Sequence, residues 1–166
     1  MSVVMGNQDK IYVDWIDKVK VLQKAAVLNK NGQILALKRT GDPKRPNPGC
    51  WDLAGGRVES SDIVKWKNKS GKGDDNDILI NALRREIKEE TGLEVENIRA
   101  IHAASAYSEK KEMLIVAIGY SCKAADESRL KLSAEHTESC WAAKEEFMKL
   151  EIGNDGGFIE SFLDKL

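Results

Sequence analysis

Three glutamates of one short segment, Glu86, Glu89 and Glu90, have a spacing that could hold a divalent cation. On a helix, residues three and four positions apart lie one turn apart, so the three carboxylates share one side. Gly92 is a typical helix stop, which would place Glu89 and Glu90 at the negative end of the helix dipole. Carboxylates crowded there repel one another unless a cation is present. Because Mg²⁺ and Mn²⁺ prefer oxygen ligands of this kind, the segment predicts a site for Mg²⁺ or Mn²⁺.

A glycine pair, Gly55-Gly56, stands upstream of these glutamates, directly after the short run 51–54. Together with this pair, Arg85–Leu93 resembles the signature of the Nudix hydrolases. The second half of that signature reads Arg-Glu, an apolar residue, any residue, Glu-Glu, any residue, Gly and an apolar residue, and Arg85–Leu93 matches it throughout. The resemblance spans roughly residues 18–165. It implies an α/β (α+β) fold, an α/β/α sandwich with a mixed central sheet.

The chain departs from the signature in spacing. Counted from Gly56, the pattern places its arginine at position 70, fifteen residues before Arg85. Counted back from Arg85, the position of the signature's remaining glutamate is taken by Asp77. We therefore expect one domain, residues 1–166, with an insertion at about 60–76.

The resemblance also implies roles for individual residues. Metal ligands carry over by motif position to three side chains and one backbone carbonyl: Glu86, Glu89, Glu90 and Gly55. Arg85 would orient a glutamate by a bidentate contact, which lysine makes poorly. The base that activates water is one of the helix glutamates, Glu89 and Glu90 among them, or a loop acid, for which the candidates are Glu135 and Glu138. Arginines on the segments around the glycine pair would hold phosphates: Arg39, Arg45 and Arg57.

These roles describe a metal-dependent pyrophosphohydrolase. Its substrate would be a nucleoside diphosphate linked to another moiety, with a nucleoside triphosphate, oxidised or not, as the default. The alternative is a non-catalytic nucleotide-binding module of the same fold, which the insertion and Asp77 favour. The presence of all three glutamates favours the enzyme, since a binding module has no need of them.

Hydrophobic patterning predicts the elements that position these residues. Strands are expected at 11–16, 19–28, 34–38, 51–54, 98–107, 113–122 and 136–142. Helices are expected at 77–91, 144–150 and 158–166. Asn29–Gly32 is a hairpin turn signal. Segment 60–76 is polar and is expected to be a loop with one helical turn around 64–66.

Composition narrows the functional classes. The 166 residues include 26 basic and 27 acidic ones, a net charge of −1, so nothing indicates stable nucleic-acid or membrane binding. No apolar run approaches the ~20 residues that cross a bilayer, and no secretory signal is visible. Three scattered cysteines are typical of reduced thiols, which favours a cytoplasmic location. The expected partner is a small nucleotide-type molecule, and a homodimer is left open.

Overall fold

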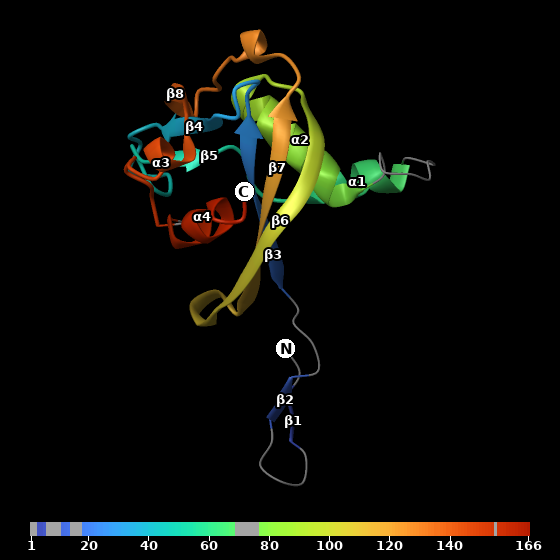
Figure 1. Cartoon of the computed structure of the whole chain (residues 1–166). Coiled ribbons are helices and arrows are strands. Elements are labelled where there is room, and N and C mark those ends of the chain that lie inside the picture. The colour runs from blue at the N-terminus through green and yellow to red at the C-terminus, as the bar shows by residue number, and fades with distance from the viewer. Residues whose placement is uncertain (1–2, 6–10, 14–17, 69–76, 155) are drawn as a thin grey trace.

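The computed structural model describes residues 3–5, 11–13, 18–68, 77–154 and 156–166 (Figure 1). Two short strands, β1 (Val3–Met5) and β2 (Ile11–Val13), pair in an antiparallel two-stranded sheet. The strand expected at 11–16 is thus found at its start, and positions 14–16 lie outside the described residues. The other strands form one six-stranded sheet: β3 (Val19–Leu28), β4 (Ile34–Arg39), β5 (Trp51–Leu53), β6 (Val95–Ser108), β7 (Met113–Ala124) and β8 (His136–Ala142).

The sheet is mixed, as predicted. Its strand order is β5-β4-β3-β7-β6, and β8 pairs with β4. β3 and β4 form the expected hairpin, with Leu28 opposite Ile34, and β3 runs parallel to β7 along its whole length. The 3₁₀ turn Glu109–Lys111 joins β6 to β7, and a second 3₁₀ turn, Glu127–Arg129, lies between β7 and β8.

Both faces of the central strands are buried, and alternate residues point to opposite faces. Ala25, Leu35 and Leu37 pack into one hydrophobic cluster with side chains of α2 (Ile78–Thr91). Ala26, Ile34 and Ala36 pack into a second cluster with side chains of α3 (Lys144–Phe147) and α4 (Gly156–Leu163). Figure 1 shows α2 on one side of the sheet and α4 on the other. The predicted α/β/α sandwich is therefore confirmed.

The predicted helix at 77–91 forms because both of its ends are well capped. The Asp77 side chain accepts hydrogen bonds from the backbone N–H groups of Leu79 and Ile80, and the helix ends at Gly92, whose φ is +70°. The other two helices differ in extent from the prediction. α3 ends at Phe147, and α4 begins at Gly156 and ends at Leu163.

The loop prediction for 60–76 was wrong in its first half. Residues Ser60–Asn68 form a helix, α1, which lies beside α2. Its sequence has no continuous apolar stripe, and the side chain that anchors it is the buried carboxylate of Asp62. Residues 69–76 lie outside the described part of the chain.

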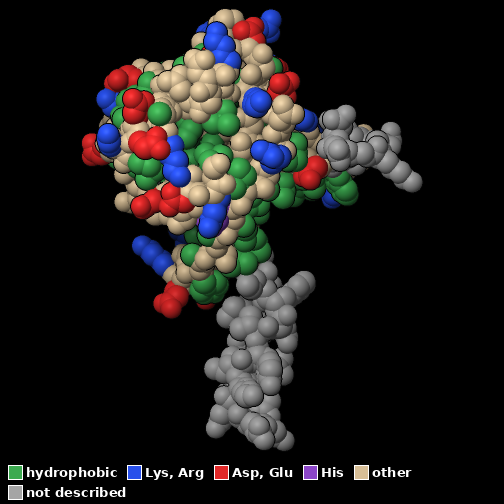
Figure 2. Space-filling view, viewed as in Figure 1, with side chains coloured by type: hydrophobic (Ala, Val, Ile, Leu, Met, Phe, Trp, Pro, Cys, Tyr) green, Lys and Arg blue, Asp and Glu red, His purple; other side chains and the backbone are tan. Residues whose placement is uncertain are grey.

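Acidic and basic side chains are interspersed over the face of the molecule seen in Figure 2. Among the described residues, no helix is both long enough and apolar enough to span a membrane. Cys50, Cys122 and Cys140 are free thiols, in agreement with their scattered positions in the sequence.

Candidate functional site

All of the sequence-predicted site residues except Glu138 meet around one cavity of about 760 Å³ between β3, α1 and α2. Its lining includes the three helix glutamates and the three predicted phosphate-binding arginines: Glu86, Glu89, Glu90, Arg39, Arg45 and Arg57. Gly55, Gly56, Arg85 and Glu135 also line it. Seven basic side chains face five acidic ones here, a mixture that suits both cations and phosphates.

The glycine pair lets backbone and carboxylates approach closely. Gly55 has a φ of +134°, and a Cβ there would stand 2.2 Å from the carbonyl oxygen of Gln23 on β3. A Cβ on Gly56 would stand 2.3 Å from the carboxyl carbon of Glu86. Gly56 accepts a backbone hydrogen bond from Gln23 (2.7 Å), which ties the pair to the sheet. Position 55 therefore requires glycine because of the backbone beside it, whereas a side chain at position 56 would displace the carboxylate of Glu86.

Glu90 is the most buried of the three helix glutamates, with 9 % of the residue exposed. Its Oε2 accepts a hydrogen bond from the Gly55 N–H (2.8 Å), and its Oε1 lies 3.9 Å from Nε2 of the buried His136. Burial raises the pKa of Glu90 to about 8 and lowers that of His136. A carboxyl group so desolvated requires a proton or a cation beside it.

Arg85 holds the other two glutamates. Its Nη1 donates to Oε1 of Glu86 and to Oε2 of Glu89, both at 3.1 Å. Glu86 is half-buried and its pKa is raised by burial, whereas the side chain of Glu89 is 60 % exposed. The bidentate contact that the sequence predicted for Arg85 goes to neither glutamate.

The bidentate partner of Arg85 is Asp62 on α1. Nε and Nη2 of Arg85 donate to Oδ1 and Oδ2 of Asp62, each at 2.9 Å, and Nη2 also reaches the carbonyl of Arg57 (3.1 Å). Asp62 is 5 % exposed, and the hydrogen bond from Arg85 lowers its pKa. The same contact raises the pKa of Arg85, so the pair is charged throughout the physiological range.

Asp62, the buried partner of Arg85, was missed by the sequence analysis, although a signal for it was present. It stands six positions after Gly56, where the signature has its remaining glutamate. The prediction that Asp77 occupies this position of the signature was wrong. Counting back from Arg85 ignores the extra residues before α2, and the Asp77 side chain caps α2 instead. The extra residues therefore lie after Asp62 rather than before it.

Most basic side chains of the cavity already have a carboxylate partner. Lys24 and Arg39 both contact Oδ2 of the buried Asp52, at 2.5 and 3.0 Å. Arg45 contacts Oε1 of Glu135 at 2.7 Å on the exposed rim. Arg57, by contrast, is exposed and has no such partner among the described residues.

Glu138, one of the two loop candidates for the base, does not line the cavity. Its side chain is 56 % exposed and pairs with Lys38 (2.7 Å). A β-bulge explains this orientation, because Glu138 pairs with Lys38 whereas His136 pairs with the next residue of β4, Arg39. The regular alternation that would put Glu138 on the same side as the buried His136 is thereby broken. Glu135, the other loop candidate, lies at the cavity.

The donor set fits a hard divalent cation, since oxygen ligands from Glu86, Glu89 and Glu90 border one cavity. Within the described part of the chain, however, no three His, Cys, Asp or Glu side chains are arranged to hold an ion. Arg85 draws Glu86 and Glu89 toward itself, while Glu90 turns to Gly55. Metal binding at this site therefore requires side-chain rotations of the two more exposed glutamates. The ligand roles of these residues and of the Gly55 carbonyl stay predictions.

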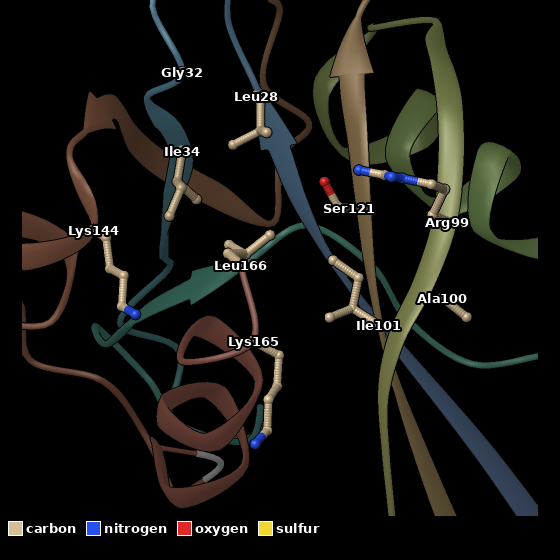
Figure 3. A pocket seen from close by; sticks show the side chains of 10 residues that line it. All are labelled: Leu28, Gly32, Ile34, Arg99, Ala100, Ile101, Ser121, Lys144, Lys165 and Leu166. Carbon is tan, nitrogen blue, oxygen red and sulfur yellow. The ribbon is translucent and has the colours of Figure 1, made fainter.

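A second cavity, of about 590 Å³, lies between β6, β7 and the end of α4 (Figure 3). Leu28, Ile34 and Ile101 contribute apolar side chains, and Arg99, Lys144 and Lys165 contribute positive ones. No acidic side chain lines it. It therefore lacks the ligands that the first cavity offers to a metal ion.

The family model described as NUDIX domain matches residues 23–162. No curated protein matches the chain. Solved structures share its fold at low identity. A MutT protein from Methanosarcina mazei Go1 is 24 % identical, with a TM-score of 0.60 over 89 % of this chain and 91 % of that one.

Two further structures were solved with a ligand or as a complex. The NUDIX domain of Shewanella oneidensis NrtR, complexed with ADP ribose, is 14 % identical, with a TM-score of 0.59 over 89 % of this chain and 86 % of that one. A C. elegans Ap4A hydrolase, in a binary complex, is 19 % identical, with a TM-score of 0.53 over 87 % and 93 % of the two chains.

Proposed function

Because the chain belongs to the NUDIX domain family and is a Nudix hydrolase acting on phosphorus-containing anhydrides, we propose that it is a divalent-metal-dependent pyrophosphohydrolase of nucleotides. The observation that carries this proposal is the arrangement of Glu86, Glu90 and the glycine pair at one cavity with seven basic side chains. Acidic groups there suit a metal ion, and basic groups suit phosphates.

In this proposal the metal is Mg²⁺ or Mn²⁺, held by Glu86, Glu89, Glu90 and the carbonyl of Gly55. When bound, such an ion neutralises phosphate oxygens and lowers the pKa of a bound water. The chain's own residues position the ligands. Asp62 fixes the guanidinium of Arg85, and Arg85 in turn restricts the carboxylates of Glu86 and Glu89.

The proposed phosphate contacts are Arg39, Arg45 and Arg57. Arg39 is held in place by Asp52, and Arg57 extends into the cavity without a carboxylate partner among the described residues. Of the two loop acids, Glu135 is the better candidate for the base, since it lines the cavity and Glu138 does not. The ion pair with Arg45 lowers the pKa of Glu135, which keeps this carboxylate unprotonated and at the same time makes it a weaker base.

The substrate is proposed to be a nucleotide with a phosphoanhydride bond, with a nucleoside triphosphate as the first choice. ADP ribose and Ap4A, which appear in the descriptions of two proteins of the same fold, are of the same chemical kind. Both are nucleoside diphosphates linked to another moiety, and both contain at least one phosphoanhydride bond.

A substrate panel tests this function. Purified protein with Mg²⁺ or Mn²⁺ is incubated with nucleoside triphosphates, oxidised triphosphates, dinucleoside polyphosphates and ADP ribose, and the release of phosphate or pyrophosphate is measured. At least one class is expected to be hydrolysed, and EDTA is expected to stop the reaction. Binding of nucleotide without turnover of any class would instead support a non-catalytic binding module.

Metal affinity is expected to depend on pH through Glu90. Because its pKa in the metal-free protein is raised to about 8, a cation must displace a proton below that pH. The affinity for Mn²⁺, measured by titration calorimetry, should rise about tenfold per pH unit from about pH 6 to pH 8 and then level off. A pH-independent affinity would contradict this.

Stability should respond to the same proton. Between the unfolded pKa of about 4.5 and the folded pKa of about 8, the folded protein binds more protons than the unfolded chain. The melting temperature of the metal-free protein should therefore fall as pH rises through this range, and saturating Mg²⁺ should offset the fall. Glu90→Gln serves as the control, because it removes the titrating group and should flatten the dependence.

A further inference from the structure

The basic residues of the main cavity divide into two groups. Lys24, Arg39, Arg45 and Arg85 each contact a carboxylate directly. Lys20, Arg57 and Lys65 have no carboxylate within ion-pair distance among the described residues, although all three line the cavity. A basic side chain without an ion-pair partner can bind an anion from solution, so within the described part of the chain these three residues carry the available positive charge of the cavity.

The second group gathers at one end of the cavity. On β3, Lys20, Leu22 and Lys24 alternate along the strand and all border the cavity, so they point to the same side. Lys24 stands at the end where Asp52 and Arg39 lie. Lys20 stands four residues back along the strand, about 13 Å away. Arg57 forms a bridge with Leu22, between the two lysines.

Helix α1 begins beside this end, because the N–H of Val58 donates to the carbonyl of Val21, the residue after Lys20, and α1 starts two residues later. Ser61 and Lys65 are four positions apart, so both lie on one side of α1, and both line the cavity. The buried contact of Asp62 with Arg85 fixes α1 against α2, so the backbone of Lys65 is held in a defined position. Two carboxylates lie at this end, Glu59, which lines the cavity, and Asp62, which is one turn before Lys65 and is buried in its bidentate contact with Arg85. The three basic groups therefore face only one carboxylate, that of Glu59, within the cavity lining.

We propose that Lys20, Lys65 and Ser61 form a phosphate subsite for the third phosphate group of the substrate, counted along the polyphosphate chain. The inference rests on the proposed function and deepens it. In this arrangement the phosphates next to the cleaved bond lie by the glutamates and Arg57, and the rest of the polyphosphate extends toward α1. The enzyme thus prefers substrates with three or more phosphates over those with two, such as ADP ribose.

Binding of non-hydrolysable nucleotides tests the subsite without turnover. The probes are adenosine triphosphate with CH₂ groups in place of both bridging oxygens and adenosine diphosphate with a CH₂ group in place of its one bridging oxygen. Dissociation constants are measured with Mg²⁺ for wild type, Lys65→Ala, Lys20→Ala and the control Lys67→Ala. Lys67 lies on the same helix, is exposed and does not line the cavity.

Lys65→Ala and Lys20→Ala are each expected to weaken triphosphate binding about tenfold, the loss of one charge-assisted contact, and to leave diphosphate binding within about twofold. Lys67→Ala should change neither. An equal loss for both probes, or no loss for either, would overturn the subsite. Should wild type hydrolyse nothing in the substrate panel while this discrimination persists, the proposed function fails and the subsite stands.

Discussion

Glu90→Gln is expected to lower kcat/KM by about 10³-fold while the protein remains as stable as wild type. Glutamine keeps an oxygen to accept the hydrogen bond from the Gly55 N–H and has the same size, but it lacks the negative charge that a divalent cation requires. Loss of a metal ligand at the reacting phosphates costs several kcal/mol of transition-state stabilisation, and about 4 kcal/mol corresponds to 10³-fold. Steady-state kinetics with Mg²⁺, together with thermal unfolding, measure both quantities.

A matched control separates this effect from a general loss of acidic charge. Glu94→Gln changes an exposed glutamate just beyond the same helix, paired with Lys88 and outside the main cavity. Its activity should remain within about twofold of wild type, because exposed pairs contribute little. Equal activity of Glu90→Gln and Glu94→Gln would remove Glu90 from the proposed site.

Asp62→Asn is expected to have the second-largest effect, on stability as well as rate. The substitution leaves the largely buried guanidinium of Arg85 without its bidentate carboxylate partner, although Glu86 and Glu89 remain in contact with it, and breaking a buried pair in this way costs about 3 kcal/mol. Arg85 then holds Glu86 and Glu89 less firmly, so kcat should fall between about tenfold and 100-fold. Denaturant unfolding and steady-state kinetics test the two parts.

Asp62→Glu distinguishes a loss of the ion pair with Arg85 from a general destabilisation of α1 by any substitution at position 62. Glutamate is the residue that the Nudix signature carries at this position, and it can restore a bidentate carboxylate contact to Arg85. We expect this variant to recover most of the stability and to keep kcat within about fivefold of wild type, because it restores the ion pair with Arg85. If Asp62→Asn is as stable and active as wild type, the pair does not position the glutamates.

The helix that carries the glutamates could be predicted from sequence because its signals are local. Asp77 and Gly92 cap its two ends, and an apolar stripe lies between them. The strands around Ala25, Leu35 and Ile118 could be predicted for the same reason, since their apolar runs are bounded by turn residues. Residues close in sequence carry all of this information.

What the sequence did not reveal depends on residues far apart in the chain. Helix α1 is held by the contact of Asp62 with Arg85, and hydrophobic periodicity does not predict a pair of this kind. The outward orientation of Glu138 follows from a bulge between β4 and β8, and strand alternation alone predicts the opposite. Which cations of the cavity are already paired also depends on tertiary contacts, such as that of Arg45 with Glu135.

The most direct test of the proposed metal site is to locate a divalent cation at the end of α2. Crystals of the wild-type protein soaked in Mn²⁺ at about pH 8 would be examined for anomalous scattering. We expect a peak within coordination distance of the carboxylates of Glu86 and Glu90 and of the Gly55 carbonyl, with the Glu86 carboxylate turned away from Arg85. Occupied Mn²⁺ sites elsewhere with none at these carboxylates, or well-ordered crystals without any peak, would contradict it.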